Sequence, residues 1–548
     1  MRGPRRLWKQ VAGVVGGLTL LATGCQSQGG PAPTAHPTTT FQTVLYVPDT
    51  INPLQTKSVW GADVDDLMFD SLVTVRPDLT FGPDLAERWQ ASADGKVWTF
   101  WLNPKARWWD GHPVTARDVV FTYQLESNPQ SGFPWAANDR ATIASVVAKG
   151  NYQVEFTLTH PDGAFLANFA AQNSGNWILP AYLLEKLPVD QVAKSPYLNN
   201  PADMVGTGPF QPVNYHPNQS ILLRANPHYF LGFPKLARLS IQFVAQSDTI
   251  AAELVRHSLD LVPQVPQSAE KALLQDSATT SAYRFARGIR LSYRYVMFNF
   301  QRLPALANRW LRTGLIQAVD RQAIVDQVLG HDGVVANGPI PPVSWAYNPA
   351  PASGWAYSPA AARQDLARAG YHWNAQGQAV DSSNRPLRLQ LVIESNRAAY
   401  QNIAAVIQQD LGAIGVGVEV RALPPPAFVQ ALEAGDFDLA LVGWTLTADP
   451  DQGPLFASNQ VPPAGENFGH YHSPTVDRLL QAEETSASQS ERRQIFFELQ
   501  AAMAKDPPGI FLYFPDDYYA VKKTVQGYQF NPDMDFYQPW KWTLTAPR

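Results

Sequence analysis

The stretch LRLQLVIESNRAAYQNIAAVIQQDLGAIGVGVEV, residues 387–420, decides the fold class of this chain. Leu387–Ile393 is predicted to be a strand, Ala398–Leu411 a helix, and Val416–Val420 a second strand. A strand, a helix and another strand in this order predict a βαβ unit with a parallel pair of strands. We therefore expect an α/β protein.

Elements of the same two kinds are predicted on both sides of this unit. Strands are expected at 43–47, 97–102 and 152–158, each bounded by turn residues. Thr115, followed three residues later by Asp118, has the pattern of a capping box at the start of a helix. No repeat of fixed period occurs, and the length of 548 residues predicts more than one lobe.

The composition excludes several classes of protein. The chain is 45% hydrophobic, which is enough apolar side chain to bury a large core. Its net charge is −5 and it has no long basic run, so we expect no nucleic-acid partner. A single cysteine, Cys25, excludes intramolecular disulfides, zinc ribbons and iron–sulfur clusters.

The N-terminal segment predicts export and a lipid anchor. Arg2, Arg5, Arg6 and Lys9 precede an apolar run, 11–22, that is too short to span a bilayer. The sequence LATGC at 21–25 resembles the lipobox of bacterial lipoproteins, although its leucine lies one position further from the cysteine than usual. We expect a signal peptide at 1–24, lipidation of Cys25, a flexible tether at 25–40, and an extracytoplasmic protein anchored to the cell membrane, on its outer face or its periplasmic side. The alternative is a plain secretory signal, with Cys25 incidental.

Motifs of enzymes and metal sites give little support to a catalytic function. The motifs GxSxG, HExxH, GxGxxG and the Walker A loop are absent. Ser268–Lys271, Ser382–Asn384 and Lys523–Val525 follow the order of a serine-acylating, penicillin-recognising enzyme, but the third lacks its glycine. His470 and His472 could form a metal pair, for which no third ligand is predictable. We expect no enzyme activity, no cofactor and no metal site.

Four blocks, in order along the chain, resemble family 5 of the bacterial extracellular solute-binding proteins, the dipeptide and oligopeptide receptors of ABC importers. The longest block ends in WWDGHPVTARDVVF at 108–121, and the second begins with GTGPF at 206–210. The third runs from 298 to 325, and the fourth from 436 to 480. The resemblance implies binding and transport of a solute.

The resemblance also implies a two-lobed fold of the periplasmic-binding-protein type (type II, cluster C), with an extra domain inserted in the first lobe. The expected parts are lobe I (41–85, 203–298 and 515–548), the inserted domain II (86–202) and lobe III (299–514). The chain is expected to cross between the lobes near 298–300 and near 511–516. Such a hinge lets the lobes close over a solute.

The ligand-lining residues implied by the resemblance are Ser58, Val59, Trp60, Asn299, Trp444, Thr447 and Asp449. Peptide receptors of the family commonly have an aspartate at the position of Thr447, where it pairs with the ligand's α-ammonium group. The shorter spacing here, with Asp449 as the nearest acid, resembles oligopeptide receptors of Gram-positive bacteria. Asp449 is therefore either the amine partner or the cap of a turn at Pro450.

The function expected from these observations is capture of peptides and their delivery to the permease of an ABC importer, by a protein that we expect to be a monomer. The alternatives are the same fold with nickel or a metallophore, an oligosaccharide or an opine as cargo. His470 or His472 would matter for a metal cargo. A serine-acylating enzyme built around Ser268 is a third class of function.

Overall fold

The computed structural model describes residues 40–134, 141–170, 176–350 and 355–545. The predicted signal peptide, Cys25 and the tether, apart from Thr40, lie outside these residues. No helix within the described ranges combines the length and the apolar character needed to cross a membrane.

The predicted βαβ unit is present. β17 (Arg388–Glu394) and β18 (Gly417–Leu423) pair in parallel, with Leu391 opposite Val420. α14 (Ala398–Ala413) connects the two strands, and its apolar side chains are buried in the same core as the strands. The α/β class predicted from this stretch is confirmed.

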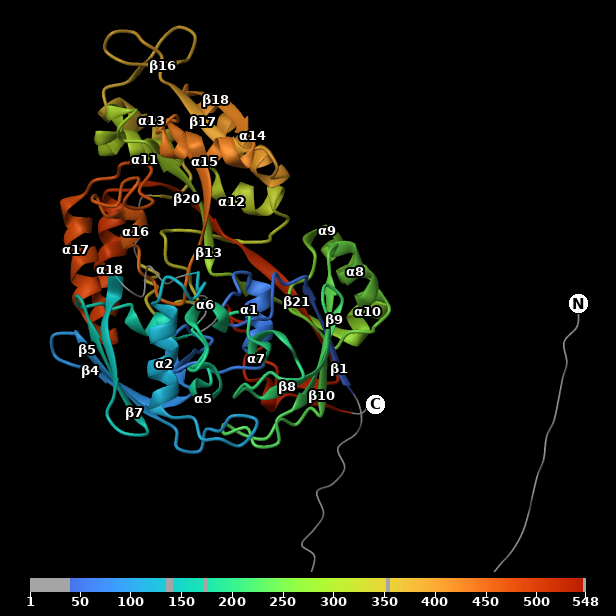
Figure 1. Cartoon of the computed structure of the whole chain (residues 1–548). Coiled ribbons are helices and arrows are strands. Elements are labelled where there is room, and N and C mark those ends of the chain that lie inside the picture. The colour runs from blue at the N-terminus through green and yellow to red at the C-terminus, as the bar shows by residue number, and fades with distance from the viewer. Residues whose placement is uncertain (1–39, 135–140, 171–175, 351–354, 546–548) are drawn as a thin grey trace, which may run out of the picture. The chain divides into compact units, whose positions relative to one another are not determined.

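In the described part of the chain, β17 and β18 belong to a six-stranded sheet with the order β14–β20–β13–β19–β17–β18 (Figure 1). Its other strands are β13 (Ser292–Phe298), β14 (Val334–Val335), β19 (Leu439–Thr445) and β20 (Gly509–Phe514). The longer helices around this sheet are α11 (Arg309–Ala318), α13 (Pro359–Arg368), α15 (Pro425–Glu433), α17 (Pro474–Thr485) and α18 (Gln489–Lys505). Side chains from these helices and strands form one large apolar core.

Seven further strands among the described residues form a second large sheet, in the order β12–β21–β11–β1–β10–β9–β8. They are β1 (Thr40–Tyr46), β8 (Phe210–His216), β9 (Ser220–Ala225), β10 (Arg238–Val244), β11 (Leu261–Val262), β12 (Tyr283–Ile289) and β21 (Asp516–Lys522). One face packs on α8 (Ser247–Val255) and α9 (Gln267–Gln275), and the other packs partly on α1 (Val59–Asp65).

The chain passes between the two large sheets at two points in the described residues. β12 and β13 are joined by Arg290–Leu291, and β20 and β21 are joined by Pro515 (Figure 1). The second crossing lies inside the range predicted for it, 511–516. The first was expected near 298–300, which is the far end of β13. An apolar strand has the same sequence pattern in either sheet, so the pattern does not indicate which sheet receives it.

A smaller sheet lies within the range predicted for the inserted domain. Its four strands, counted over the described residues, have the order β4–β5–β7–β6. They are β4 (Ala86–Ala91), β5 (Val97–Leu102), β6 (Ile143–Ala148) and β7 (Gln153–Leu158). α2 (Ala116–Glu126) begins at the predicted capping box, where Thr115 N donates to Asp118 Oδ2 at 2.8 Å. The predicted start of this helix is confirmed.

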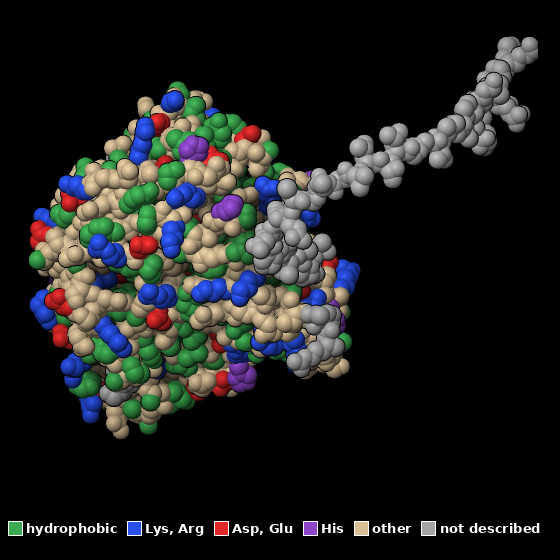
Figure 2. Space-filling model, turned by 90° about the horizontal axis from the view of Figure 1, so that it is seen from below, with side chains coloured by type: hydrophobic (Ala, Val, Ile, Leu, Met, Phe, Trp, Pro, Cys, Tyr) green, Lys and Arg blue, Asp and Glu red, His purple; other side chains and the backbone are tan. Residues whose placement is uncertain are grey.

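The remaining α-helices and strands of the described residues are short. They are α5 (Ala181–Leu184), α6 (Val189–Val192), α7 (Pro196–Asn199), α10 (Ser277–Ala282), α12 (Arg321–Ala323), α16 (Gly453–Phe456) and the strand pairs β2–β3 (Val73–Val75, Phe81–Pro83), β15–β16 (His372–Trp373, Ala379–Val380) and β22–β23 (Val525–Gln526, Thr543–Leu544). On the face shown in Figure 2, Lys and Arg side chains are scattered among polar, acidic and apolar ones rather than gathered in one patch.

Candidate functional site

A cavity of about 410 Å³ lies beside both crossings between the large sheets. From the side of the seven-stranded sheet it is lined by Trp60 of α1 and Asp517 of β21. From the side of the six-stranded sheet it is lined by Arg294 of β13 and by Leu446, which follows β19. Ligand pockets are typically clefts of about 300–1,000 Å³ that often lie between domains. This cavity is therefore the candidate site.

The first turn of α1 brings two of the predicted residues, Val59 and Trp60, to the cavity wall. Ser58 holds the start of the helix, because its Oγ accepts a hydrogen bond from Gly61 N at 3.1 Å. The same hydroxyl donates to Asp49 Oδ1 at 2.6 Å. Val59 is 53% exposed. Ser58 thus positions the helix, and its two neighbours line the cavity.

Arg290, in the first crossing, has protein partners for its charge. Its Nε donates to Asp517 Oδ2 at 3.0 Å, and its Nη1 lies 3.5 Å from Asp535 Oδ1. Its Nη2 donates to the Pro263 carbonyl oxygen at 3.2 Å. Burial raises the pKa of Asp535, and the nearby guanidinium opposes that rise. Arg290 therefore ties the crossing to β21 and to the C-terminal segment.

Arg294, which follows Arg290 in the chain and lies in β13, has different surroundings. Its side chain lies over Gly443 of the paired strand β19, where an added Cβ would come within 2.8 Å of Arg294 Cδ. Its Nη1 donates to Ser292 Oγ and to the Tyr293 carbonyl oxygen. No carboxylate among the described residues forms an ion pair with it. The cavity wall thus includes a guanidinium without a protein counter-charge.

Two predicted residues near the end of β19 do not line this cavity. The Trp444 ring lies parallel to the ring of Phe468, with centroids 6.3 Å apart, and packs against the core of the six-stranded sheet. The Thr447 hydroxyl donates to the Asp449 carbonyl oxygen at 3.0 Å. Thr445 and Leu446, which lie between them, line the cavity.

Asp449, the candidate amine partner, is buried in an ion-pair cluster outside the cavity. Its two carboxylate oxygens accept hydrogen bonds from Arg492 Nη1 and Nη2 at 2.6 and 2.7 Å. Arg492 Nη2 also donates to Glu483 Oε2 at 2.7 Å. Asp449 Oδ1 accepts from the backbone N–H of Asp451 at 3.1 Å, which is the turn-cap arrangement. Because its carboxylate already has these partners, the structure supports the turn cap rather than the amine partner.

The same cluster connects the six-stranded part of the molecule to the inserted region. Arg492 Nη1 donates to the Gly163 carbonyl oxygen at 2.8 Å, and Gly163 N donates to the Glu484 carbonyl oxygen at 2.6 Å. Burial raises the pKa of Asp162 to about 6, and neighbouring carboxylates add to the rise. Burial likewise raises the pKa of Glu483. The contact between the two regions thus combines backbone hydrogen bonds of Gly163 with the buried charges around Arg492.

Asn299 has a structural position at the far end of β13. Its side-chain amide donates to the carbonyl oxygens of Gly435 and Phe437 at 3.0 and 2.9 Å. Its side-chain oxygen accepts from the backbone N–H groups of Gln301 and Arg302 at 3.1 and 3.0 Å. Asn299 is fully buried, so the ligand contact predicted for it is not supported; it holds the turn after the strand.

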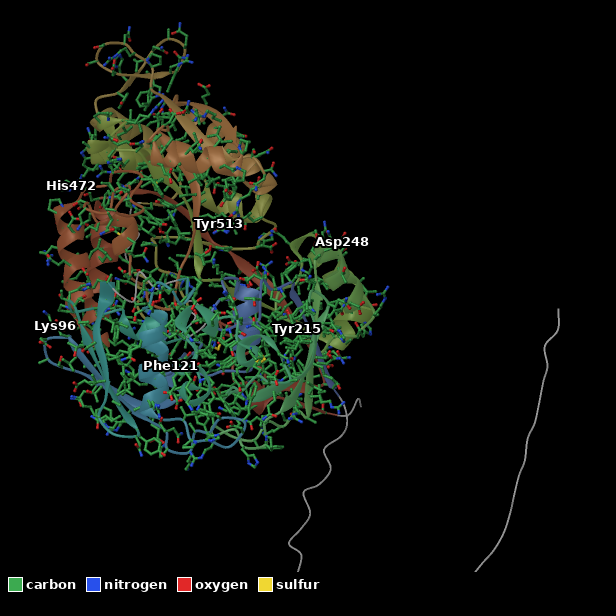
Figure 3. The ribbon with its side chains drawn as sticks, in the orientation of Figure 1. Lys96, Phe121, Tyr215, Asp248, His472 and Tyr513 are labelled. Carbon is green, nitrogen blue, oxygen red and sulfur yellow. The ribbon has the colours of Figure 1, made fainter. Side chains whose placement is uncertain are left out.

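The two histidines considered for a metal cargo lie outside the cavity. His470 and His472 precede α17, and His472 lies at the outer edge of the molecule, away from Tyr513 of β20 (Figure 3). His472 Nδ1 is 3.7 Å from Asp477 Oδ2. Over the described ranges, no three or more His, Cys, Asp or Glu side chains form a group that could hold a metal ion.

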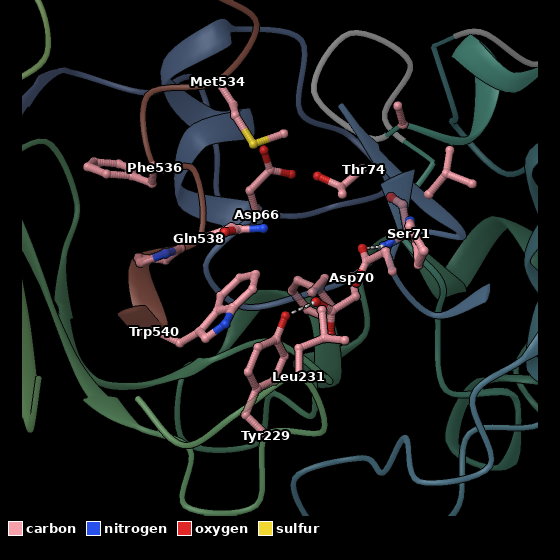
Figure 4. Close-up of a pocket in the computed structure, with 16 residues that line it drawn as sticks. Asp66, Asp70, Ser71, Thr74, Tyr229, Leu231, Met534, Phe536, Gln538 and Trp540 are labelled. Atoms are coloured by element: carbon pink, nitrogen blue, oxygen red, sulfur yellow. Dashed lines mark hydrogen bonds between the residues drawn. The ribbon is translucent and has the colours of Figure 1, made fainter. Parts of the chain in front are cut away.

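A second, smaller cavity of about 70 Å³ contains a buried pair of aspartates (Figure 4). Tyr229 OH donates to Asp70 Oδ1 at 2.9 Å, and Ser71 N donates to Asp84 Oδ2 at 3.1 Å. Burial raises the pKa of Asp70 to about 6 and raises that of Asp84 as well. Each aspartate is held by a hydrogen bond from a neighbouring residue and the space is small, so we assign this cavity to the fold rather than to ligand binding.

Sequence reasoning missed three residues that give the candidate cavity its charge: Arg290, Arg294 and Asp517. One signal was available in β13, whose sequence SYRYVMF places an arginine inside an otherwise apolar and aromatic strand. A charged residue is rarely buried without a partner or a function.

A family model described as bacterial extracellular solute-binding proteins, family 5, middle, matches residues 80–464, more than half of the chain. The chain belongs to this family. Members of family 5 are extracellular or periplasmic solute-binding receptors and not enzymes. The two large sheets and their two crossings, seen among the described residues, are accordingly the two lobes of a type II binding protein.

Several members of family 5 are similar to this chain over most of their length. The oligopeptide-binding protein AppA of Bacillus subtilis is 27% identical over 501 residues, which cover 91% of this chain and 90% of that protein. The AppA structure in complex with a nonapeptide has a TM-score of 0.67 at 26% identity and covers 92% of this chain and 99% of AppA. NikZ of Campylobacter jejuni, solved with Ni(L-His), has a TM-score of 0.68 at 28% identity, with 92% and 99% covered. The probable D,D-dipeptide-binding periplasmic protein DdpA of Escherichia coli is 27% identical over 459 residues, or 82% of this chain and 83% of DdpA.

Proposed function

We propose that this family 5 protein is the receptor of an ABC importer, and that it captures short peptides in the cavity between its lobes and delivers them to the permease. The observation that carries the proposal is the charge on the cavity wall. Asp517 and Asp535 lie on the side of the seven-stranded sheet, where they share one cation, Arg290, so that this wall keeps an excess of negative charge; Arg294 lies on the other side. A peptide with free ends carries one positive and one negative charge, so the wall matches it in both signs. The names of AppA and DdpA support the same cargo.

The physical demands of peptide binding fit a closing cleft. The backbone N–H and C=O groups of a peptide must be paired once water is excluded. Each hydrogen bond contributes only about 0.5–1.5 kcal/mol, whereas association costs about 4–15 kcal/mol. Paired terminal charges and apolar contacts with Trp60 and Leu446 supply part of the difference. The two crossings serve as the hinge, and the closed form is favoured by its extra contacts with the ligand.

The proposal includes a lipid anchor on Cys25, which follows the signal peptide 1–24 and is the first residue of the tether that leads to β1. A single acyl chain gives marginal membrane binding, and two or three on one residue give stable anchoring. The receptor is proposed to act as a monomer on the extracytoplasmic side of the membrane. Cys25→Ser is expected to move the protein from the membrane fraction to the soluble extracytoplasmic fraction. Unchanged membrane association of this variant would contradict the anchor.

The cargo is tested with the purified chain. Native mass spectrometry reports any ligand that co-purifies. A mixture of synthetic peptides with free termini, from dipeptides to nonapeptides, is then offered, and the peptides retained after gel filtration are identified. The proposal predicts retention of a subset of peptides, with displacement on unfolding. Retention of Ni(L-His) and of no peptide would instead assign the protein to the nickel-binding members of the fold.

A further inference from the structure

The two arginines of the cavity wall, Arg290 and Arg294, differ in whether a carboxylate of the protein pairs with them. Arg290 has Asp517 and Asp535 as partners, at 3.0 and 3.5 Å. Arg294 donates from Nη1 to a hydroxyl and to a carbonyl oxygen, and it has no carboxylate partner within the described ranges. A cation that lacks a counter-charge in a cavity has an unsatisfied preference for an anion.

We propose that Arg294 is the anchor for a carboxylate of the ligand and thereby determines that the receptor selects solutes with a free carboxylate. The inference rests on the proposed function and goes beyond it, because it assigns one residue and one chemical group. The carboxylate is that of the peptide C-terminus or that of an Asp or Glu side chain, and the test below separates the two sources.

The edge of the Arg294 guanidinium formed by Nε and Nη2 can pair with a carboxylate. Both of its hydrogen bonds leave from Nη1, so within the described residues Nε and Nη2 have no hydrogen-bond partner. These two groups form the side of the guanidinium that pairs with both oxygens of a carboxylate. Gly443 leaves the space for the side chain, because a Cβ there would lie 2.8 Å from Arg294 Nε.

The neighbours of Arg294 do not neutralise it. Tyr400 and Tyr513 are close enough for the guanidinium to affect them, and burial raises the pKa of Tyr513 to about 12 and that of Tyr400 as well. Both phenols are therefore neutral at physiological pH and supply no negative charge. Arg397, another cation near these tyrosines, is already ion-paired with Glu394. A ligand carboxylate would be the counter-charge that the protein does not provide.

The opposite wall gives the ligand a direction. Asp517 and Asp535 lie on the side of the seven-stranded sheet, with Arg290 between them. Because the two acids share a single cation, this wall keeps an excess of negative charge, and a bound peptide would place its ammonium group toward it and its carboxylate toward Arg294. The direction of the bound peptide would follow from the fold, because Asp517 belongs to the seven-stranded sheet and Arg294 to the six-stranded sheet.

The test compares two peptide mixtures on the full chain. One has free C-termini, and the other has the same sequences with amidated C-termini. Wild type is expected to retain peptides of the free mixture and to bind the best of them about tenfold to a hundredfold more tightly than its amide, the usual range for hydrogen bonds to a charged group. Arg294→Gln is expected to remove this preference by weakening the free peptide and leaving the amide unchanged. Arg294→Lys should recover part of it, because lysine keeps the charge and loses the fork.

The control and the outcomes separate this inference from the proposed function. Arg388→Gln removes an exposed arginine from β17, outside the cavity, and should leave both mixtures unaffected. Equal retention of free and amidated peptides, unchanged in Arg294→Gln, would overturn the anchor and leave the peptide receptor standing. If acidic peptides of the amidated mixture depend on Arg294, the side-chain carboxylate is the bound group. If folded wild type retains no peptide from either mixture, the proposed function and the anchor both fail. Near-ultraviolet circular dichroism verifies that each variant is folded.

Discussion

Arg492 and Arg294 differ in the partners of their guanidinium groups, and this difference decides whether each residue serves stability or binding. Arg492 is buried, and it donates to Asp449, to Glu483 and to the Gly163 carbonyl oxygen. Arg294 lies on the wall of the cavity and has no acidic partner among the described residues. Arg492 has its counter-charges within the protein and holds parts of the structure together, whereas the counter-charge proposed for Arg294 is that of a ligand. The difference predicts stability effects at one site and binding effects at the other.

The largest expected effect is on stability, at the buried cluster. Arg492→Met leaves Asp449 and Glu483 buried without their cation, so the free energy of unfolding should fall by about 3–5 kcal/mol. The adjacent, exposed Arg493→Met is the matched control and should change it by less than about 0.5 kcal/mol. Urea unfolding curves measure both. Equal unfolding curves for Arg492→Met and Arg493→Met would contradict the stabilising role assigned to Arg492.

The next effect is on binding. Trp60 lines the cavity from α1, so Trp60→Ala should weaken the affinity for the tightest retained peptide by about 2 kcal/mol, a typical loss for an aromatic anchor in a binding site. Trp101→Ala, in the inserted sheet, removes a half-buried tryptophan that stacks under Arg88, and it should leave the affinity unchanged. Isothermal titration calorimetry gives both values. An unchanged affinity in Trp60→Ala would place the ligand elsewhere.

A single methyl group should disturb the contact between the Arg492 cluster and the inserted region. In Gly163→Ala the new Cβ would lie 2.5 Å from the Glu483 carbonyl oxygen and 2.6 Å from that of Ser486. Backbone atoms cannot move aside freely, so a loss of about 1–2 kcal/mol in unfolding free energy is expected. Gly338→Ala meets no atom within 4 Å and is the control. Equal melting temperatures for the two variants would show that this contact is not tightly packed.

The smallest effect is a pH dependence at the same contact. Burial raises the pKa of Asp162 to about 6; Asp449 and Asp451 add to the rise, and Arg492 opposes it. The folded protein therefore holds this proton more tightly than the unfolded chain does, and the contribution of Asp162 to the free energy of unfolding falls as the pH rises from about 4 to about 6. Asp162→Asn should reduce that fall by about 1 kcal/mol, because the side chain is partly exposed to solvent. Melting temperatures at pH 4 and pH 7 measure it, and identical pH slopes would contradict the assignment.

The sequence predicted those elements whose signals are local. The βαβ unit at 387–420 and the capping box at Thr115 depend on neighbouring residues, and both are present. The first crossing was misplaced by the length of one strand, because the apolar sequence of β13 does not show which of the two sheets the strand joins. Val59 and Trp60, which the resemblance to family 5 implies as ligand-lining residues, lie on the wall of the cavity, and their contact with a ligand stays a prediction.

The charges of the site depend on contacts that are distant in sequence, and these were not predictable. Asp449 was weighed as an amine partner, yet its carboxylate pairs with Arg492, 43 residues later. Arg290 is similarly held by Asp517, 227 residues later. A sequence shows which residues carry charge, but only the fold shows which of those charges already have partners.

The central claim, that the two lobes close on a captured peptide, is tested most directly by a distance across the cleft. The chain has one cysteine, so Cys25→Ser with Val255→Cys and Val429→Cys gives two labelling sites, on α8 and α15. Both valines are exposed, at 55% and 46%. Pulsed electron paramagnetic resonance should show the distance distribution between the two spin labels shift and narrow when a retained peptide saturates the protein. A distribution that is unchanged at saturation would contradict closure and the account built on it.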